Sequence, residues 1–330
     1  MQVLVTGGAG FIGSHLADRL VRDGYRVTII DNESTGRMIN MPTAARYIKG
    51  DVTRLQELEP AFVDDLDVVL HIAGHVSLIR SYTDPSLDLK TNVQGTINVL
   101  QLCLKYRVPR LLYASSMTVY GHTATLPIPE DAACRPISYY GITKYAAERY
   151  VHAMAQRRDL DFNFDVTSFR MFSVYGPRQA LDNPYQGVLG IFLGNLFRDE
   201  PISIFGDGEQ SRDFVYIDDV VEAWAGAVNN STTFGQVINL GSGHRLSLNE
   251  LANRVLDAFG RDRNNHPVRY LPARSGEQRD VEADIERAHS LLGWAPRISF
   301  AEGLANTVHW AKQNHEALSK ASTSSGGVVR

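Results

Sequence analysis

The sequence predicts an α/β fold, a Rossmann-like doubly wound parallel sheet with a smaller C-terminal α+β lobe for the substrate. A glycine-rich turn follows the first apolar run at 3–5, and a carboxylate, Asp31, ends the second run at 27–30. Short runs rich in valine, isoleucine and leucine then alternate with helical patterns up to about residue 170. Such alternation is typical of buried parallel strands connected by helices. The 330 residues suffice for one large domain and a smaller lobe.

The glycine-rich turn has the spacing Gly7-x-x-Gly10-x-x-Gly13 and opens a helical stretch at 14–21. A strand that turns on glycines into a helix directs backbone N–H groups and the positive helix end at one point, where an anion can bind. Asp31 stands where a dinucleotide-binding fold places the acid that binds the adenosine ribose. These features favour a dinucleotide site over a turn selected only for tight packing.

The apolar runs also predict how the chain is divided. We expect strands of the main sheet at 3–6, 26–31, 46–50, 68–73, 110–115 and 165–169. After 176–178 the elements become shorter, with strands expected at 202–205, 214–217 and 237–240. We therefore expect a dinucleotide-binding domain at 1–175 and a substrate lobe at 176–318, some segments of which return to the main sheet. The small polar residues at 319–330 predict a disordered tail.

Composition argues against several classes of function. The formal net charge of −4 disfavours bulk nucleic-acid binding. The two cysteines, Cys103 and Cys134, lack the paired spacing of a metal site or a disulfide framework, so we expect no metal and a reducing compartment. The longest apolar stretch, at 188–197, is too short for a bilayer, and no secretory signal is recognised. We expect a cytoplasmic protein without a membrane or nucleic-acid partner.

A tyrosine and a lysine at helical spacing are the candidate catalytic pair. Tyr140 and Lys144 lie four residues apart at the start of a predicted helix and so share one face. A free tyrosine has a pKa of about 10, and a nearby ammonium together with an oxidised nicotinamide is expected to lower it. Alone, this spacing also fits a solvated helix pair. A cluster of hydroxyls, Ser115, Ser116 and Thr118, stands at the end of the strand at 110–115, at the edge where open α/β sheets bind ligands, and a serine hydroxyl there can donate and accept.

Together these motifs resemble the extended short-chain dehydrogenase/reductase family, in its nucleotide-sugar branch, from residue 1 to about residue 315. The resemblance is carried by TGGAGFIGSH at 6–15, DN at 31–32, GDV at 50–52, HIAG at 71–74, SSMTVYG at 115–121, YGITK at 140–144, FRMFSVYGPRQ at 169–179, FGDGEQSRDFVYIDDV at 205–220 and LGW at 292–294. It implies that Ser116 is the catalytic hydroxyl, Tyr140 the base and Lys144 its partner.

The resemblance also implies NAD as the cofactor and a set of residues around it. These are Gly7, Gly10, Phe11, Ile12, Gly13, Asp31, Asn32, Asp51, Val52, Ala73, Gly74, Asn92, Tyr140, Lys144 and Phe172. Independently of the resemblance, the Asp31 carboxylate would repel the 2′-phosphate of NADP, although the nearby Arg37 could weaken this preference.

On the substrate side the resemblance implies a site for a nucleoside diphosphate sugar. Its residues are Ser77, Ser116, Ser173, Val188, Ser203, Phe205, Arg212, Arg274, Glu277 and Val281. Phe205 would stack on uracil, and guanidinium groups suit the diphosphate. Glu277 stands where the family usually has Asp, and Ser173 stands where it has Asn. Val281 would face the sugar, and its small side chain would tolerate a bulky substituent at C2.

The resemblance thus implies an NAD-dependent nucleotide-sugar 4-epimerase of the UDP-glucose/UDP-galactose type. A 4-ketoreductase, a dehydratase or a decarboxylase of the same family stays open, as does a non-catalytic NAD-binding regulatory protein. The family also implies a homodimer in which helices at 93–104 and 140–154 pair across a twofold axis. We expect Leu102, Cys103, Ala147 and Val151 on the outer face of those helices.

Overall fold

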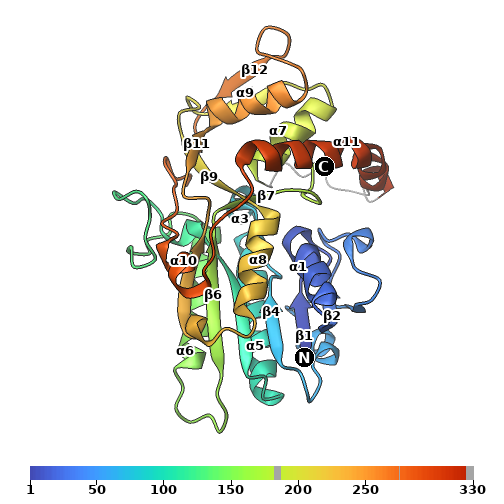
Figure 1. Ribbon diagram of the computed structural model, residues 1–330, viewed down its shortest axis with the longest axis vertical. Coiled ribbons are helices and arrows are strands. Elements are labelled where there is room, and N and C mark those ends of the chain that lie inside the picture. The colour runs from blue at the N-terminus through green and yellow to red at the C-terminus, as the bar shows by residue number, and fades with distance from the viewer. Residues whose placement is uncertain (182–186, 275, 325–330) are drawn as a thin grey trace.

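The structure, a computed structural model, describes residues 1–181, 187–274 and 276–324. Its main body is a seven-stranded parallel sheet with the strand order β10-β6-β5-β4-β1-β2-β3 (Figure 1). The strands are β1 (Gln2–Thr6), β2 (Arg26–Asp31), β3 (Arg46–Lys49), β4 (Val68–His71), β5 (Arg110–Ser116), β6 (Asp165–Met171) and β10 (Gln236–Leu240). The predicted Rossmann-like α/β class and all six strands predicted for the N-terminal part are confirmed.

Helices cover both faces of the main sheet. Residues Val3 and Val5 of β1 belong to one hydrophobic cluster and Leu4 to another, because successive side chains of a strand point to opposite faces. One face packs against α1 (Phe11–Arg22), α8 (Ile217–Ala227) and α10 (Glu286–Leu292), and the other against α2 (Leu55–Leu58), α5 (Gly95–Lys105) and α6 (Tyr139–Ala155). In Figure 1, α1 and α8 lie side by side on the first of these faces.

A smaller lobe lies beyond one end of the sheet, at the top of Figure 1. It contains β7 (Ser173–Tyr175), β8 (Ile202–Phe205), β9 (Ser211–Tyr216), β11 (Arg245–Ser247), β12 (Val268–Leu271), α7 (Val188–Phe197), α9 (Leu248–Ala258) and α11 (Phe300–Ser324). Between β9 and β11 the chain returns to the main sheet and forms β10, which pairs with β6. Helix α11 continues to Ser324, so it includes the first six residues of the stretch predicted to be a disordered tail.

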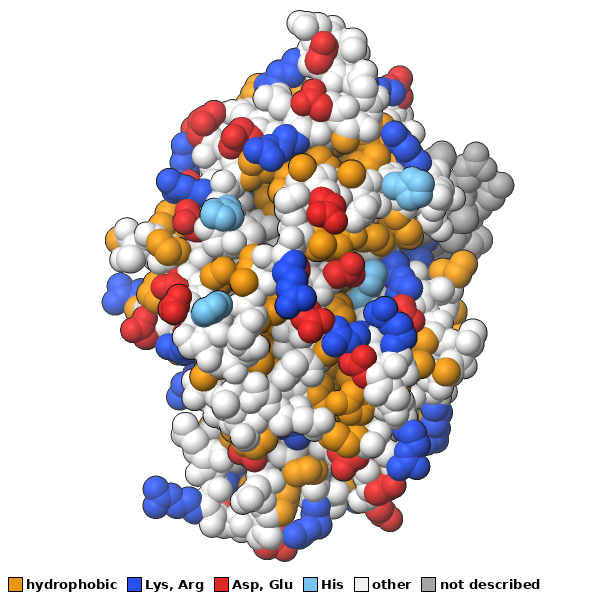
Figure 2. Space-filling view, in the orientation of Figure 1, with side chains coloured by type: hydrophobic (Ala, Val, Ile, Leu, Met, Phe, Trp, Pro, Cys, Tyr) orange, Lys and Arg blue, Asp and Glu red, His pale blue; other side chains and the backbone are white. Residues whose placement is uncertain are grey.

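Short helices complete the described chain. They are α3 (Leu78–Thr83), α4 (Pro85–Leu89), a π-helix (Lys90–Gln94) and four 3₁₀ turns at Met38–Asn40, Glu59–Ala61, Met117–Val119 and Ser231–Thr233. Figure 2 shows acidic and basic side chains interspersed over the face that it displays. Among the helices of the described residues, none is long and apolar enough to cross a membrane.

Strand β9 begins three residues earlier than the predicted strand at 214–217. Its first residues include Asp213. A charged residue is untypical of a buried strand, so nothing in the sequence indicates that the strand begins before it. The Asp213 carboxylate is fully buried and accepts hydrogen bonds from the backbone N–H groups of Ser242, Gly243 and Ala283. A buried charge supplied with donors in this way is compatible with a central strand.

Candidate active site

Two adjoining cavities lie at the C-terminal edge of the main sheet. The sheet cavity, about 380 Å³, is bordered by the glycine-rich turn, the ends of the parallel strands and the start of α6. The lobe cavity, about 320 Å³, extends from there between the sheet and the smaller lobe. Five residues line both cavities, namely Val76, Met117, Ser173, Gly187 and Val188. A ligand in one cavity can therefore reach a ligand in the other.

The glycine-rich turn forms one wall of the sheet cavity. Gly7 has a φ of +70°, and a Cβ atom there would lie 2.8 Å from the backbone nitrogen of Ala73. At Gly13 a Cβ atom would lie 2.1 Å from the carbonyl oxygen of Gly7, so neither position accepts a side chain. Helix α1 begins directly after Gly10, which provides no side-chain cap. The N–H groups of its first turn therefore remain available to an anion in the cavity.

Asp31 closes the far end of the sheet cavity. Its carboxylate is mostly buried and accepts hydrogen bonds from the backbone N–H groups of Ala9, at 3.0 Å, and Glu33, at 2.7 Å. Burial raises the pKa of Asp31, and these two donors act in the opposite direction. Its neighbour Asn32 donates to Asp51 at 3.0 Å. Asp51 therefore supports the wall from behind and does not line the cavity.

Most of the residues predicted for the cofactor surround this one cavity. Those that line it are Gly7, Gly10, Phe11, Ile12, Gly13, Asp31, Asn32, Val52, Ala73, Gly74, Tyr140, Lys144 and Phe172. Of the predicted set, Asp51 and Asn92 stand behind the wall.

The predicted catalytic residues meet in the sheet cavity near its junction with the lobe cavity. Ser116 is the last residue of β5, and its hydroxyl accepts a hydrogen bond from the Thr118 hydroxyl at 3.0 Å. Tyr140 and Lys144 lie on the first turns of α6, which begins after Ser138 because that side chain accepts from the backbone N–H group of Gly141 at 3.1 Å. All three predicted groups line the sheet cavity.

Burial dominates the electrostatics of the candidate catalytic pair, Tyr140 and Lys144. It raises the pKa of Tyr140 to about 12, with a hydrogen bond to Ser116 acting in the opposite direction and the negative charge of Asp88 adding to the rise. It lowers the pKa of Lys144 to about 8, against the negative charges of Asp88 and Glu148. The expected lowering of the pKa of Tyr140 is therefore wrong for the protein alone. Within the protein, desolvation outweighs the hydrogen bond to Ser116.

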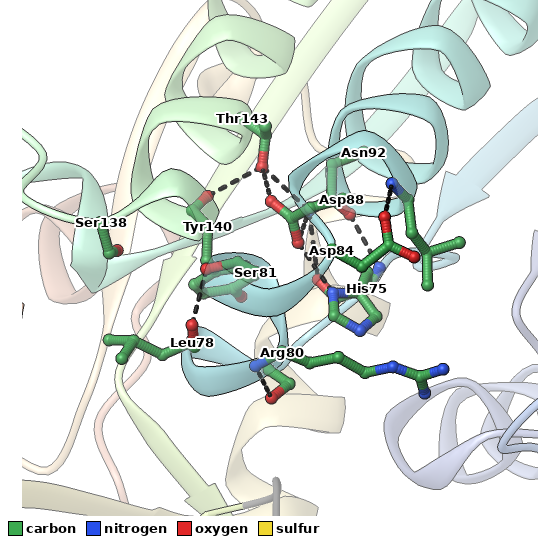
Figure 3. Close-up of polar contacts among 12 residues, drawn as sticks. His75, Leu78, Arg80, Ser81, Asp84, Asp88, Asn92, Ser138, Tyr140 and Thr143 are labelled. Carbon is green, nitrogen blue, oxygen red and sulfur yellow. Dashed lines mark hydrogen bonds and ion pairs between the residues drawn. The ribbon is translucent and has the colours of Figure 1, made fainter. Parts of the chain in front are cut away.

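A buried hydrogen-bond network joins α6 to the loop after β4 (Figure 3). The Asp88 carboxylate accepts from the Thr143 hydroxyl at 2.5 Å, from His75 Nδ1 at 2.8 Å and from Asn92 Nδ2 at 3.3 Å. Asn92 in turn accepts from the backbone N–H group of His75 at 2.8 Å. Asn92 thus positions the loop that includes Gly74. Asp88 and Thr143 were missed in the sequence, where only the four-residue spacing of Asp88 and Asn92 hints at a shared helix face.

Charged and aromatic side chains gather at the outer end of the lobe cavity. The guanidinium of Arg274 lies over the Phe205 ring, 3.4 Å from its centroid. The Glu277 carboxylate pairs with Arg212 at 3.5 Å and with Arg274 at 3.8 Å. Of the predicted substrate residues, the structure places seven around this cavity: Ser173, Val188, Ser203, Phe205, Arg212, Arg274 and Glu277.

Two predicted substrate residues lie elsewhere. Ser77 is buried and caps α3 by accepting from the backbone N–H group of Arg80 at 3.0 Å. Val281 is fully buried in a small hydrophobic cluster with Val119 and Ile128 and lines neither cavity. The prediction that Val281 faces the sugar is therefore corrected, because its apolar side chain packs into the core. Gln278, which the sequence did not single out, lines the cavity instead.

The chain is similar to known epimerases over nearly its whole length. A UDP-glucose 4-epimerase of Mycolicibacterium smegmatis is 35% identical over 96% of this chain and 100% of its own length. A UDP-glucuronate 4-epimerase of Thermodesulfobacterium geofontis is 30% identical over 96% of this chain and 97% of its own. The crystal structure of UDP-glucose 4-epimerase from Thermotoga maritima with UDP-glucose has a TM-score of 0.89 and 36% identity, covering 96% of this chain and 100% of that one. The model of the NAD dependent epimerase/dehydratase family matches residues 3–241, and the chain belongs to this family of NAD-dependent enzymes.

Proposed function

We propose that the protein is a nucleotide-sugar 4-epimerase, an isomerase that acts on UDP-glucose or a similar UDP-hexose. The observation that carries this proposal is the position of Tyr140 and Ser116 in the sheet cavity, where Met117, the neighbour of Ser116, also lines the lobe cavity. A nucleoside diphosphate bound by Arg212 and Arg274 would extend its sugar from the outer end of the lobe cavity towards the Tyr140 phenol. Two of the relatives named above are UDP-glucose 4-epimerases.

The sheet cavity fits NAD, the cofactor of the family. The glycine-rich turn brings the start of α1, which has no side-chain cap, to the wall of this cavity, where its N–H groups suit a diphosphate. Asp31 at one end suits the ribose hydroxyls of the adenosine, and Lys144 at the other suits those of the nicotinamide ribose. When bound there, NAD supplies the oxidising and then the reducing equivalent for C4 of the sugar.

The chain's own residues move the proton and hold the sugar. The Tyr140 oxygen accepts the proton of the C4 hydroxyl and later returns it, while the Ser116 hydroxyl orients the same sugar oxygen. Lys144 keeps a positive charge one helical turn away, and the nicotinamide of bound NAD⁺ would add a second; together they would favour the phenolate against the burial that raises the pKa of Tyr140 in the protein alone. Phe205 and the two arginines hold the nucleotide and leave the sugar free to present its other face.

A dehydratase is disfavoured by the lining of the cavities. Elimination of water from the sugar requires an acid and a base next to the carbon that loses its hydroxyl. Among the described lining residues the carboxylates are Asp31 and Glu277, which lie at the two outer ends. The positions beside Ser116 are occupied by Met117 and Thr118. We therefore favour epimerisation.

NMR analysis of the purified protein incubated with UDP-glucose, without added nicotinamide, tests this function. The expected result is conversion to UDP-galactose by protein that already carries NAD, because an epimerase regenerates its cofactor in every cycle. Accumulation of NADH in step with product would indicate a dehydrogenase. Retention of NAD without any change in the sugar would favour a regulatory protein.

We also propose a homodimer formed by α5 and α6. The outer-face residues expected from the sequence, Leu102, Cys103, Ala147 and Val151, are instead buried within their own chain. The exposed face of α6 presents Tyr139, Ile142 and Tyr150, each about half exposed. Burial of such side chains against a second copy would be favourable. Light scattering is expected to give a mass twice the 36.6 kDa of one chain, and Ile142→Glu should reduce the measured mass to that of one chain. A wild-type protein of one chain mass would refute the dimer.

A further inference from the structure

The lobe cavity has two chemically different ends. All the charged side chains among its described lining residues, Arg212, Arg274 and Glu277, gather with Phe205 at the outer end. The opposite end adjoins the sheet cavity, which Tyr140 lines. In the proposed function, the outer end holds the nucleotide and the inner end surrounds the sugar.

The inner end is walled mainly by apolar side chains. These are Val76 and Met117, which line both cavities, together with Leu78, Ile79 and Ile137. Residues 182–186 precede Gly187, which lines both cavities, and residue 275 follows Arg274; these six lie outside the described part of the chain and include no lysine or arginine. No cation of the described lining residues is therefore placed to pair with an anion on the sugar at this end.

Lys144 does not supply the missing charge. It lines the sheet cavity but not the lobe cavity, and its ammonium lies 4.9 Å from the centroid of the Tyr113 ring. The negative charges of Asp88 and Glu148 already act on this ammonium.

The polar groups at the inner end suit hydroxyl groups. Gln278 is 6% exposed; its Nε2 donates to the Gly121 carbonyl, and its Oε1 is shielded from solvent. A neutral amide carries no charge to pair with a carboxylate. The Thr118 hydroxyl already donates to Ser116 at 3.0 Å.

We infer that the sugar end of this site accepts an uncharged hexose and rejects a uronic acid, that is, a sugar with a carboxylate at C6. A carboxylate without a cationic partner is strongly disfavoured in an apolar cavity, whereas a hydroxymethyl group needs one hydrogen-bond partner. This inference rests on the proposed function and narrows its substrate class. The relatives named above include enzymes of both kinds, so family membership does not decide it.

Three ligands that differ at C6 test the inference: UDP-glucose, UDP-glucuronate and the neutral amide UDP-glucuronamide. Affinity is measured by calorimetry on the NAD-containing enzyme, with UDP as the reference for the nucleotide, and kcat/KM is measured by NMR. The amide keeps the shape of the carboxylate but carries no charge. We therefore expect it to bind within about 10-fold of UDP-glucose. We expect UDP-glucuronate to have a kcat/KM at least ~100-fold lower than UDP-glucose and to bind no more tightly than UDP.

Other results would overturn the inference, the proposed function or both. A kcat/KM for UDP-glucuronate within about 10-fold of that for UDP-glucose would overturn the inference. Equal rejection of the amide and the carboxylate would also overturn it, because shape would then discriminate rather than charge. If UDP-glucose binds but is not epimerised, the proposed function fails while the affinity ratio still decides the inference. If UDP itself does not bind, both fail.

Discussion

The Thr143 hydroxyl donates a hydrogen bond to the fully buried carboxylate of Asp88 at 2.5 Å. This contact joins α4 to the helix that carries Tyr140 and Lys144. Because Asp88 also accepts from His75 and Asn92, the catalytic helix, the loop after β4 and the π-helix at Lys90–Gln94 share one anchor (Figure 3). The position of the catalytic helix thus depends on residues that line neither cavity.

Replacing Thr143 with valine should loosen this anchor. Thr143→Val removes the donor and leaves Asp88 short of one partner, so we expect the free energy of unfolding to fall by about 1–3 kcal/mol. We also expect kcat to fall about 10-fold, because Tyr140 is held less firmly. Denaturant unfolding and turnover measure the two effects. Thr143→Ser keeps the hydroxyl and is the matched control; equal losses in both variants would show that the hydroxyl is not what matters.

Tyr140 should be indispensable as the base. Tyr140→Phe removes only the phenolic oxygen, so we expect turnover to fall by roughly 10²–10⁴ while the NAD content of the purified protein is unchanged. Its neighbour Tyr139 is 46% exposed and lines neither cavity, so Tyr139→Phe is the control and should keep normal turnover. Near-normal turnover of Tyr140→Phe would remove this residue from the mechanism.

Lys144 should make the stability of the cofactor-free protein depend on pH. Burial lowers the pKa of Lys144 to about 8, so below that pH the charged side chain destabilises the folded state by on the order of 3 kcal/mol. As pH rises, the folded state loses this proton first, and the cost disappears near the unfolded pKa of about 10.4. Lys144→Met should therefore raise the unfolding temperature at pH 7, and raise it less at pH 9.5.

Differential scanning calorimetry at the two pH values measures this effect, and the exposed Lys90→Met is the control. We expect Lys90→Met to change the unfolding temperature little at either pH. A stabilisation by Lys144→Met that is the same at both pH values would show that the ammonium is not its cause.

Asp31 should select NAD over NADP. Its buried carboxylate closes the adenosine end of the sheet cavity, where a 2′-phosphate would meet a like charge. We expect NADP to bind at least ~100-fold more weakly than NAD, and Asp31→Asn to reduce this ratio about 10-fold or more. Asp51→Asn, at a carboxylate outside the cavity lining, should leave the ratio unchanged. Titration of the cofactor-free protein with both nucleotides measures it; a ratio unaffected by Asp31→Asn would contradict the role of the charge.

The parts of the site that could be predicted from sequence are those in which local spacing determines geometry. A glycine at 7 with a left-handed backbone, an acid at the end of β2 and a pair four residues apart on α6 each follow from neighbouring residues alone. The strand ends then bring Asp31 and Ser116 to one edge, because parallel strands end on the same side of a sheet.

The parts that could not be predicted depend on contacts between distant segments. Asp88 and Thr143 are 55 residues apart, and in the sequence each looks like an ordinary polar residue of a helix. Val281 and Gln278 lie in a segment without regular periodicity, where nothing indicates which side chain faces the cavity and which faces the core. The pKa of Tyr140 depends on how deeply the side chain is buried, and the four-residue spacing of Tyr140 and Lys144 does not indicate this.

The pairing of Glu277 with both Arg212 and Arg274 has a consequence for how the nucleotide end can exist without a ligand. Two guanidinium groups facing one cavity would repel each other, and the single carboxylate between them cancels one of the two positive charges. The excess is then a single positive charge, which a bound diphosphate converts into a negative excess. The free and the loaded cluster therefore carry single charges of opposite sign, so neither state has to bear a large unbalanced charge.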